Sequence, residues 1–127
     1  MIGIMEDLKI LIIDDNELDR KGMAVALRKA GYRQVMSAET ETEGVALART
    51  FLPDIVIVDC VLVRLDGFDV CRDIKAIEGL NSKIIVITGH LEAVDAVKAR
   101  KSGADELLEK TVEFENIHDT IQRLRYR

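Results

Sequence analysis

The feature that most constrains the fold of this chain is a set of three short, predominantly aliphatic runs. A polar side chain directly follows each run. The runs cover residues 8–13, 55–58 and 83–87. Each is too short for a helix, and such a run is typical of a strand buried on both faces of a parallel sheet. The polar residues that follow the runs are Asp14, Asp15, Asp59 and Thr88. Since the carboxyl ends of parallel strands meet at one edge, we expect these side chains to converge there.

Apolar residues at helical spacing separate the runs. Asn16 is expected to cap a first helix that ends before Gly31. The expected buried face of this helix comprises Leu18, Gly22, Met23, Ala26 and Leu27. The four residues from Thr40 to Glu43 fit a capping box for a second helix, which Pro53 prevents from continuing.

Three further helices are expected after Asp66-Gly67, over residues 91–102, and over about 114–124. The helix at 91–102 is polar and rich in alanine, so it buries little apolar area and should be weakly held. Its expected buried side consists of Ala93, Ala96, Val97 and Ala99. The last helix places Phe114, Ile117, Ile121 and Leu124 at three- and four-residue steps.

Two shorter and more polar strands, at 34–38 and 104–108, complete a strand–helix unit repeated five times. Parallel neighbours need crossover connections, and helices of this length supply them. We therefore predict an α/β fold with a single-domain (βα)5, doubly wound, five-stranded parallel sheet and helices on both faces. The domain would occupy residues 1–127, with its core at about 8–125 and residues 1–7 as a short extension.

Composition argues against several classes of protein. The net charge of −5 is unsuited to a nucleic-acid-binding surface. No apolar run approaches the roughly 20 residues that span a bilayer, and the start lacks a basic segment and a cleavage site. Cys60 and Cys71 are too few for a disulfide framework and lack metal-ligand spacing. We therefore expect a cytoplasmic protein with reduced thiols.

Three carboxylates at one sheet edge repel one another, by roughly 4 kcal/mol for two charges about 4 Å apart at an effective dielectric constant near 20. A hard divalent cation would relieve this repulsion. Mg2+ prefers oxygen ligands, typically one or two carboxylates with water and phosphate oxygens. The cluster of Asp14, Asp15 and Asp59 therefore points to phosphoryl chemistry.

With these features, and with Lys110 after the fifth strand, the chain resembles the receiver domains of bacterial two-component response regulators. The resemblance extends from Lys9 to about Leu124 and includes Asp66-Gly67 and the segment from Gly103 to Asp105. It implies a flavodoxin-like fold and a signalling domain that is no enzyme beyond its own phosphorylation and dephosphorylation.

The resemblance also implies a role for each site residue. Asp59 would accept a phosphoryl group from the phosphohistidine of a histidine kinase or phosphotransfer protein. Asp15, Asp59 and the main-chain oxygen of Val61 would bind Mg2+, with Asp14 acting mainly through bound water. The hydroxyl of Thr88 would move to bond a phosphoryl oxygen, and Lys110 would pair with the phosphoryl group.

The sequence departs from this family at three places. Thr111 follows Lys110 where proline, often after a cis bond, is typical, so either this bond is trans or strain is stored there. Leu107 stands where the family usually has Tyr or Phe, which makes coupling through a rotating ring doubtful. The loop from Val61 to Arg64 lacks the usual Pro and Gly, and Arg64 is expected to be exposed. By the resemblance, Val61 and His90 would flank the path of the hydrolytic water.

Simpler roles stay open for each residue. Asp14 and Asp15 could cap the following helix, Asp59 could start a turn, Thr88 could form a local turn, and Lys110 could be solvated. Two other functions also stay open. One is a phosphorylation-independent protein-binding module, and the other is a haloacid-dehalogenase-like phosphohydrolase.

The expected partners are a sensor histidine kinase or phosphotransfer protein and an unknown output domain or target protein. We expect no direct binding to nucleic acid or membrane. A free-standing receiver and the N-terminal part of a longer chain are both compatible with the sequence, as are a monomer and a phosphorylation-linked homodimer.

Overall fold

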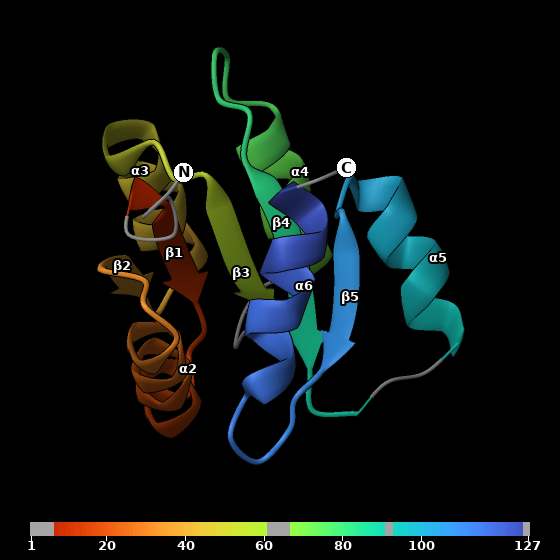
Figure 1. Cartoon of the computed structure of the whole chain (residues 1–127). Coiled ribbons are helices and arrows are strands. Elements are labelled where there is room, and N and C mark those ends of the chain that lie inside the picture. Colours follow the sequence, from red (N-terminus) through yellow and green to blue (C-terminus); the bar gives the residue numbers. More distant parts are fainter. Residues whose placement is uncertain (1–6, 61–66, 91–92, 126–127) are drawn as a thin grey trace.

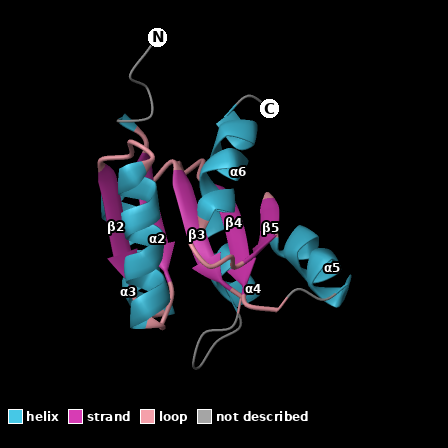
Figure 2. Cartoon of the chain, turned by 60° about the horizontal axis from the view of Figure 1, so that its bottom comes forward, coloured by secondary structure: helices cyan, strands magenta, loops and turns pink. Residues whose placement is uncertain are grey.

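The sheet is parallel throughout in the computed structural model, which describes residues 7–60, 67–90 and 93–125. Its strands are β1 (Lys9–Ile13), β2 (Gln34–Ala38), β3 (Ile55–Asp59), β4 (Lys83–Thr88) and β5 (Glu106–Glu109), in the spatial order β2-β1-β3-β4-β5. All the arrowheads point to the same edge (Figure 2). The predicted five-stranded parallel sheet is therefore confirmed.

Five helices follow the strands in turn (Figure 1). They are α2 (Glu17–Lys29), α3 (Glu41–Phe51), α4 (Gly67–Lys75), α5 (Ala93–Ser102) and α6 (Glu115–Arg125). One apolar cluster joins residues of β1, β3 and β4 to α3, α4 and α5, and a second joins alternate residues of the same strands to α2 and α6. Because successive strand side chains point to opposite faces, three largely apolar strands can fill both clusters.

The central strands carry most of this core. Residues 10–13 of β1, 56–58 of β3 and 84–87 of β4 have no solvent exposure. The edge strand β2 has only Ala38 buried, as its more polar sequence indicates. The buried centre of the sheet thus holds the ends of β1, β3 and β4 in fixed positions.

Local signals for the helix ends act largely as predicted. The side chain of Asn16 accepts the Asp19 N–H at 2.9 Å and caps α2. Thr40 caps α3 through the Glu43 N–H at 3.1 Å. The Glu43 carboxylate accepts the N–H of Glu39, one residue before the cap, at 2.9 Å.

The predictions of the buried faces of α2 and α5 are partly wrong. Leu18 is 82% exposed, because at about 3.6 residues per turn it lies nearly opposite Leu27 on α2. In α5, Ala99 is buried, but Ala96 is exposed and Val97 is 49% exposed. The side chains of residues 93–95, including Ala93, lie outside the description.

Two element boundaries also differ from the predictions. The fifth strand begins at Glu106 rather than at residue 104, because the Ala104 N–H bonds the carbonyl of Ala99 and closes α5. Phe114 precedes α6 with φ = 55° instead of lying within it. Its ring packs on Gly22 of α2, where an added Cβ would lie 2.9 Å from a ring carbon. This tertiary contact accompanies a backbone conformation that non-glycine residues rarely adopt.

Candidate functional site

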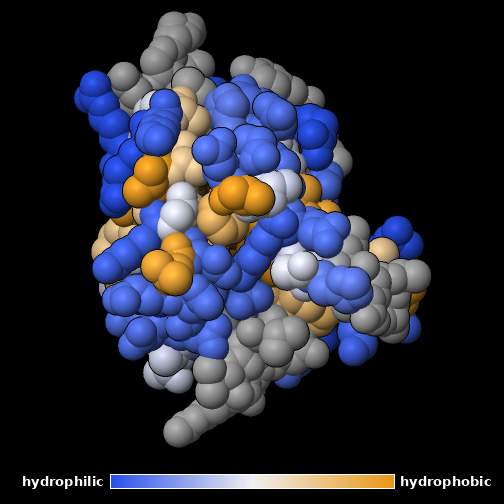
Figure 3. Space-filling model, turned by 90° about the horizontal axis from the view of Figure 1, so that it is seen from below, coloured by the Kyte–Doolittle hydropathy of each residue, from blue (hydrophilic) through white to orange (hydrophobic). Residues whose placement is uncertain are grey.

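The ends of β1 and β3 bring three carboxylates together. Ile13 pairs with Val58 in the ladder, so Asp14, which follows β1, and Asp59, the last residue of β3, reach the same edge. Asp14, Asp15 and Asp59 each offer one carboxylate oxygen, and these oxygens all lie within 4.8 Å of one another. Seen from this edge, the molecular surface is mainly hydrophilic (Figure 3).

Asp14 is fully buried and is held by several polar contacts. Its Oδ1 accepts the Asn16 N–H at 2.9 Å, and its backbone carbonyl accepts a hydrogen bond from Arg20 at 2.9 Å. Arg20 in turn lies 3.7 Å from the Glu39 carboxylate. Asn16, rather than either aspartate, caps α2, so helix capping is not what places Asp14 and Asp15 here.

Lys110 supplies the positive charge of the site. Its Nζ lies 3.1 Å from Asp14 Oδ2, 2.7 Å from Asp19 Oδ2 and 3.7 Å from Asp59 Oδ2. Its own backbone N–H bonds the carbonyl of Thr88 at 2.7 Å, which fixes the lysine beside the end of β4. The side chain is only 14% exposed, so Lys110 is not an ordinary solvated lysine.

Opposing effects set the pKa of Lys110. Burial would lower this pKa, but the hydrogen bond to Asp19 and the charges of Asp14 and Asp59 outweigh burial, and the pKa is raised above 10.5. Lys110 therefore carries a full positive charge at neutral pH.

The loop after Lys110 contains an ordinary trans peptide bond in place of the proline that is typical of the family. The described part of the chain contains no cis peptide bond, so the Lys110–Thr111 bond is trans. The Thr111 hydroxyl bonds the Glu115 carboxylate at 2.8 Å, and the Asn116 amide donates to the carbonyl of Glu109 at 2.9 Å. These contacts tie the loop to the first turn of α6.

Thr88 ends β4 at the same edge, and only 7% of its surface is exposed. Its hydroxyl contacts the backbone of His90, at 3.2 Å from the carbonyl oxygen and 3.3 Å from the N–H. The hydroxyl thus forms a local turn in this state. His90 is exposed. Val61, Arg64 and Asp66 lie outside the described residues, so their expected positions stay predictions.

Asp19, the partner that approaches Lys110 most closely, is a site residue that the sequence did not predict. It lies in the first turn of α2, four residues after Asp15. The acidic first turn is visible in the sequence, but it is equally typical of any helix N-terminus. Only the fold shows that this carboxylate meets a lysine 91 residues later in the chain.

The donor set fits a hard cation. Three carboxylate oxygens within 4.8 Å of one another match the preference of Mg2+ for oxygen ligands, and no softer nitrogen or sulfur donor belongs to the described cluster. The acidic cluster is therefore compatible with Mg2+ binding.

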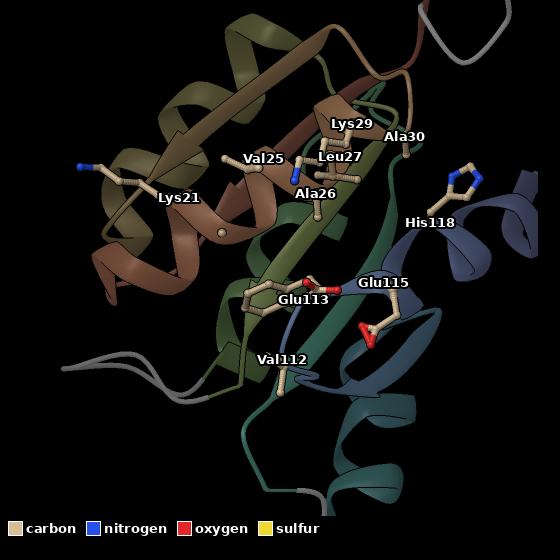
Figure 4. A pocket seen from close by; sticks show the side chains of 12 residues that line it. Lys21, Val25, Ala26, Leu27, Lys29, Ala30, Val112, Glu113, Glu115 and His118 are labelled. Carbon is tan, nitrogen blue, oxygen red and sulfur yellow. The ribbon is translucent and has the colours of Figure 1, made fainter.

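A separate groove of about 630 Å3 lies between α2 and the start of α6 (Figure 4). Its walls include Lys21, Val25 and Lys29 on one side and Val112, Glu115 and His118 on the other. Val25 is 49% exposed and Val112 is 97% exposed. The groove excludes the three aspartates of the cluster, so it is a surface feature distinct from the acidic site.

Residues 10–122 match the response regulator receiver domain family. Because the match covers most of the chain, and because the fold and acidic edge agree with it, this chain belongs to the receiver domains of response regulators. This assignment does not support the haloacid-dehalogenase-like alternative.

Individual relatives agree with the family. Protein PilH of Pseudomonas aeruginosa is 36% identical over 114 residues, which are 89% of this chain and 93% of PilH. The signal receiver domain of a DNA-binding response regulator from Colwellia psychrerythraea has a TM-score of 0.84 and 28% identity, and the match covers 95% of this chain and 100% of that domain. The chain spans only about half the length of the transcriptional regulators AfsQ1 and BvgA, which it also matches.

A third neighbour shares the fold. The receiver domain of the histidine kinase CKI1 from Arabidopsis thaliana, solved in complex with Mg2+ and BeF3−, has a TM-score of 0.87 and 23% identity, with 98% of this chain and 93% of that domain covered.

Among the described residues of the present chain, no helix is both long and apolar enough to cross a membrane.

Proposed function

We propose that this receiver accepts a phosphoryl group on Asp59 from the phosphohistidine of a histidine kinase or phosphotransfer protein. The observation that carries this proposal is the grouping of Asp14, Asp15 and Asp59 within 4.8 Å, beside the ammonium of Lys110. Repulsion among three carboxylates destabilises the fold, so its presence at a strand edge is best explained by binding chemistry.

Asp15 and Asp59 would hold Mg2+ together with the main-chain oxygen of Val61, and Asp14 would act through water. When bound, Mg2+ neutralises negative charge on transferring phosphoryl oxygens. The CKI1 receiver, which shares the fold, was solved with Mg2+ and a beryllofluoride group, and this supports the proposed pairing of metal and phosphoryl group.

In the proposed reaction, a carboxylate oxygen of Asp59 forms a bond to phosphorus as the bond from phosphorus to the donor imidazole nitrogen breaks. The imidazole leaves with the bonding electron pair and is protonated by solvent. Lys110, 3.7 Å from Asp59 Oδ2, is placed to stabilise negative charge on the phosphoryl oxygens. Burial of both side chains strengthens this interaction.

The added group would bring about −1.5 to −2 charge to the edge of the sheet. This charge gives the Thr88 hydroxyl an acceptor that competes with the backbone of His90. Leu107 in β5 has no aromatic ring to turn, so we propose that the output of this receiver does not depend on ring rotation at that position. The signal would pass to a partner or output domain.

Labelling with phosphoramidate tests the proposal, because the small donor removes the need for a cognate kinase. The wild-type protein should gain one phosphoryl group by intact-protein mass spectrometry when Mg2+ is present and none when EDTA is present. Asp59→Asn should abolish labelling and keep the wild-type circular dichroism spectrum. Asp119→Asn, at an exposed position of α6, is the matched control and should be labelled normally.

Undiminished labelling of Asp59→Asn would reject Asp59 as the acceptor. A wild-type protein that neither binds Mg2+ at millimolar concentration nor becomes labelled would favour the phosphorylation-independent binding module instead.

A further inference from the structure

The lysine of the acidic site makes its closest contact with a residue outside the carboxylate cluster. Lys110 Nζ lies 2.7 Å from Asp19 Oδ2, against 3.1 Å from Asp14 and 3.7 Å from Asp59. At 2.7 Å the contact with Asp19 is a short, charge-assisted hydrogen bond, whereas 3.7 Å is beyond hydrogen-bonding distance. In this state the ammonium is hydrogen-bonded to Asp19 and Asp14, whereas its contact with the proposed acceptor is a longer ion pair.

Local structure fixes Asp19 independently of Lys110. Its N–H donates to the capping side chain of Asn16 at 2.9 Å, in the first turn of α2. The helix starts at the edge where the strands end (Figure 2). A carboxylate in the first turn is stabilised by the helix dipole whether or not it has an ion-pair partner. Asp19 can therefore lose the ammonium without leaving a destabilised charge.

The two bonded carboxylates differ in their access to water. The Asp14 side chain has no exposure, so bulk water could not replace the hydrogen bond that this buried carboxylate would lose on release from Lys110. The Asp19 side chain is 34% exposed, and water can replace the lost hydrogen bond. If a new anion on Asp59 attracts the Lys110 ammonium, breaking the hydrogen bond to Asp19 costs less free energy than breaking the one to Asp14.

We propose that Asp19 is a positioning residue that holds the Lys110 ammonium away from Asp59 in the unphosphorylated receiver and releases it when a phosphoryl group arrives. Asp19 thereby opposes phosphorylation twice, as a competitor for the ammonium and as a like charge near the incoming anion. The inference rests on the proposed function of Asp59 and goes beyond it by adding a fourth carboxylate to the control of the site.

Calorimetric titration with beryllofluoride, a stable mimic of the phosphoryl group, measures this competition at saturating Mg2+. Asp19→Asn keeps the size of the side chain and removes its charge. We expect it to bind beryllofluoride about threefold to tenfold more tightly than the wild type, because the ammonium no longer has to leave a charged partner. Affinity for Mg2+ alone should stay the same or fall, since one nearby negative charge is lost.

Tighter binding of beryllofluoride without tighter binding of Mg2+ separates this role from a merely structural one, which would weaken the binding of both ligands. Asp19→Glu retains the charge and should stay close to the wild type. Glu17→Gln is the charge-matched control in the same helical turn, because Glu17 is exposed and lies 3.7 Å from Lys21. Glu17→Gln should change the affinities for beryllofluoride and for Mg2+ only slightly, through long-range electrostatic interaction.

Nuclear magnetic resonance gives a direct readout in the wild type. The carboxyl carbon signal of Asp19 should shift when beryllofluoride is added, whereas that of Glu17 should not. Weaker beryllofluoride binding by Asp19→Asn, or a gain no larger than that of Glu17→Gln, would overturn the role of Asp19 while leaving the proposed function intact. If the wild type binds no beryllofluoride in the presence of Mg2+, the proposed function fails, and the role of Asp19 fails with it.

Discussion

Charge balance at single residues governs the acidic edge of the sheet. One ammonium, that of Lys110, faces the carboxylates of Asp14, Asp19 and Asp59, and Asp15 adds a further negative charge. Two like charges at about 5 Å cost roughly 3 kcal/mol at an effective dielectric constant near 20. One lysine cannot offset all of this repulsion, so the protein without metal stores an unfavourable energy that a cation would release.

Asp15→Asn should therefore stabilise the metal-free protein. The substitution removes one negative charge and retains all three contacts of Lys110, and we expect the free energy of unfolding to rise by about 1 kcal/mol in EDTA. Added Mg2+ should stabilise the wild type and have much less effect on the variant, because a ligand that binds only the folded state stabilises it. Urea unfolding with and without Mg2+ measures both effects.

Glu78→Gln, at an exposed position after α4, is the control and should behave as the wild type in both buffers. A lower stability of Asp15→Asn in EDTA would show that carboxylate repulsion does not dominate this site.

At the scale of elements, α3 approaches β1 closely at a glycine. Gly44 is buried in α3, and a Cβ added there would lie 2.5 Å from Cδ1, 2.9 Å from Cγ1 and 3.2 Å from Cγ2 of Ile13. Ile13 has no exposure and is β-branched, so its side chain cannot move all three atoms away. Ile13 also directly precedes Asp14, which links this packing to the position of the acidic site.

Gly44→Ala should destabilise the protein although alanine is the better helix former. Replacing glycine in a helix interior by alanine normally stabilises by about 0.5–1 kcal/mol, whereas overpacking a filled core costs about 1–3 kcal/mol. We expect a net loss of about 1–2 kcal/mol in the free energy of unfolding. Thr42→Ala, at an exposed position of the same helix, should change it by less than about 0.5 kcal/mol. A gain in stability for Gly44→Ala would contradict the close approach.

At the scale of the whole molecule, two cores on opposite faces of one sheet hold ionisable groups that favour the neutral form. Burial raises the pKa of the Cys71 thiol to about 12, in the core formed with α3, α4 and α5. Burial also raises the pKa of Tyr32 in the opposite core, where its hydroxyl lies 2.9 Å from His118 Nδ1. Groups in both cores should therefore lower the free energy of unfolding in alkaline solution.

Stability should fall as pH rises above the ordinary thiol pKa of 9.0 and continue to fall until about 12, where the folded thiol also ionises. In this window the unfolded chain binds fewer protons than the folded one, so the free energy of unfolding decreases with pH. Between about pH 8 and about pH 10 the loss from Cys71 should be about 1 kcal/mol. Urea unfolding at several pH values measures the slope.

Cys71→Ala should lower stability at neutral pH through lost packing and flatten the slope between these two values. The raised pKa values of Tyr32 and Lys110 act mainly above this range, so they should leave the comparison undisturbed. An unchanged slope in Cys71→Ala would show that another group causes the alkaline loss.

The sequence by itself determined the class of fold, the ends of the first two helices and the three carboxylates of the edge. The reason is that these features depend on short-range patterns. Apolar runs specify buried strands, Asn16 and Thr40 cap helices within three residues, and the residue after a parallel strand must lie at the carboxyl edge. Burial on individual helix faces was less predictable, as the exposure of Leu18 and Val97 shows, because an apolar side chain can also lie on the solvent face of a helix and tertiary packing decides which face is buried.

Only the tertiary structure decided which partners the lysine has. The contact between Lys110 and Asp19 joins residues 91 positions apart, and no local pattern encodes their distance. The conformation of Phe114 likewise depends on the space above Gly22, on a different helix. Local interactions determine where the helices and strands of this receiver form. The packing of those elements sets the distances between the charged groups. These distances determine how the acidic edge responds to an incoming anion.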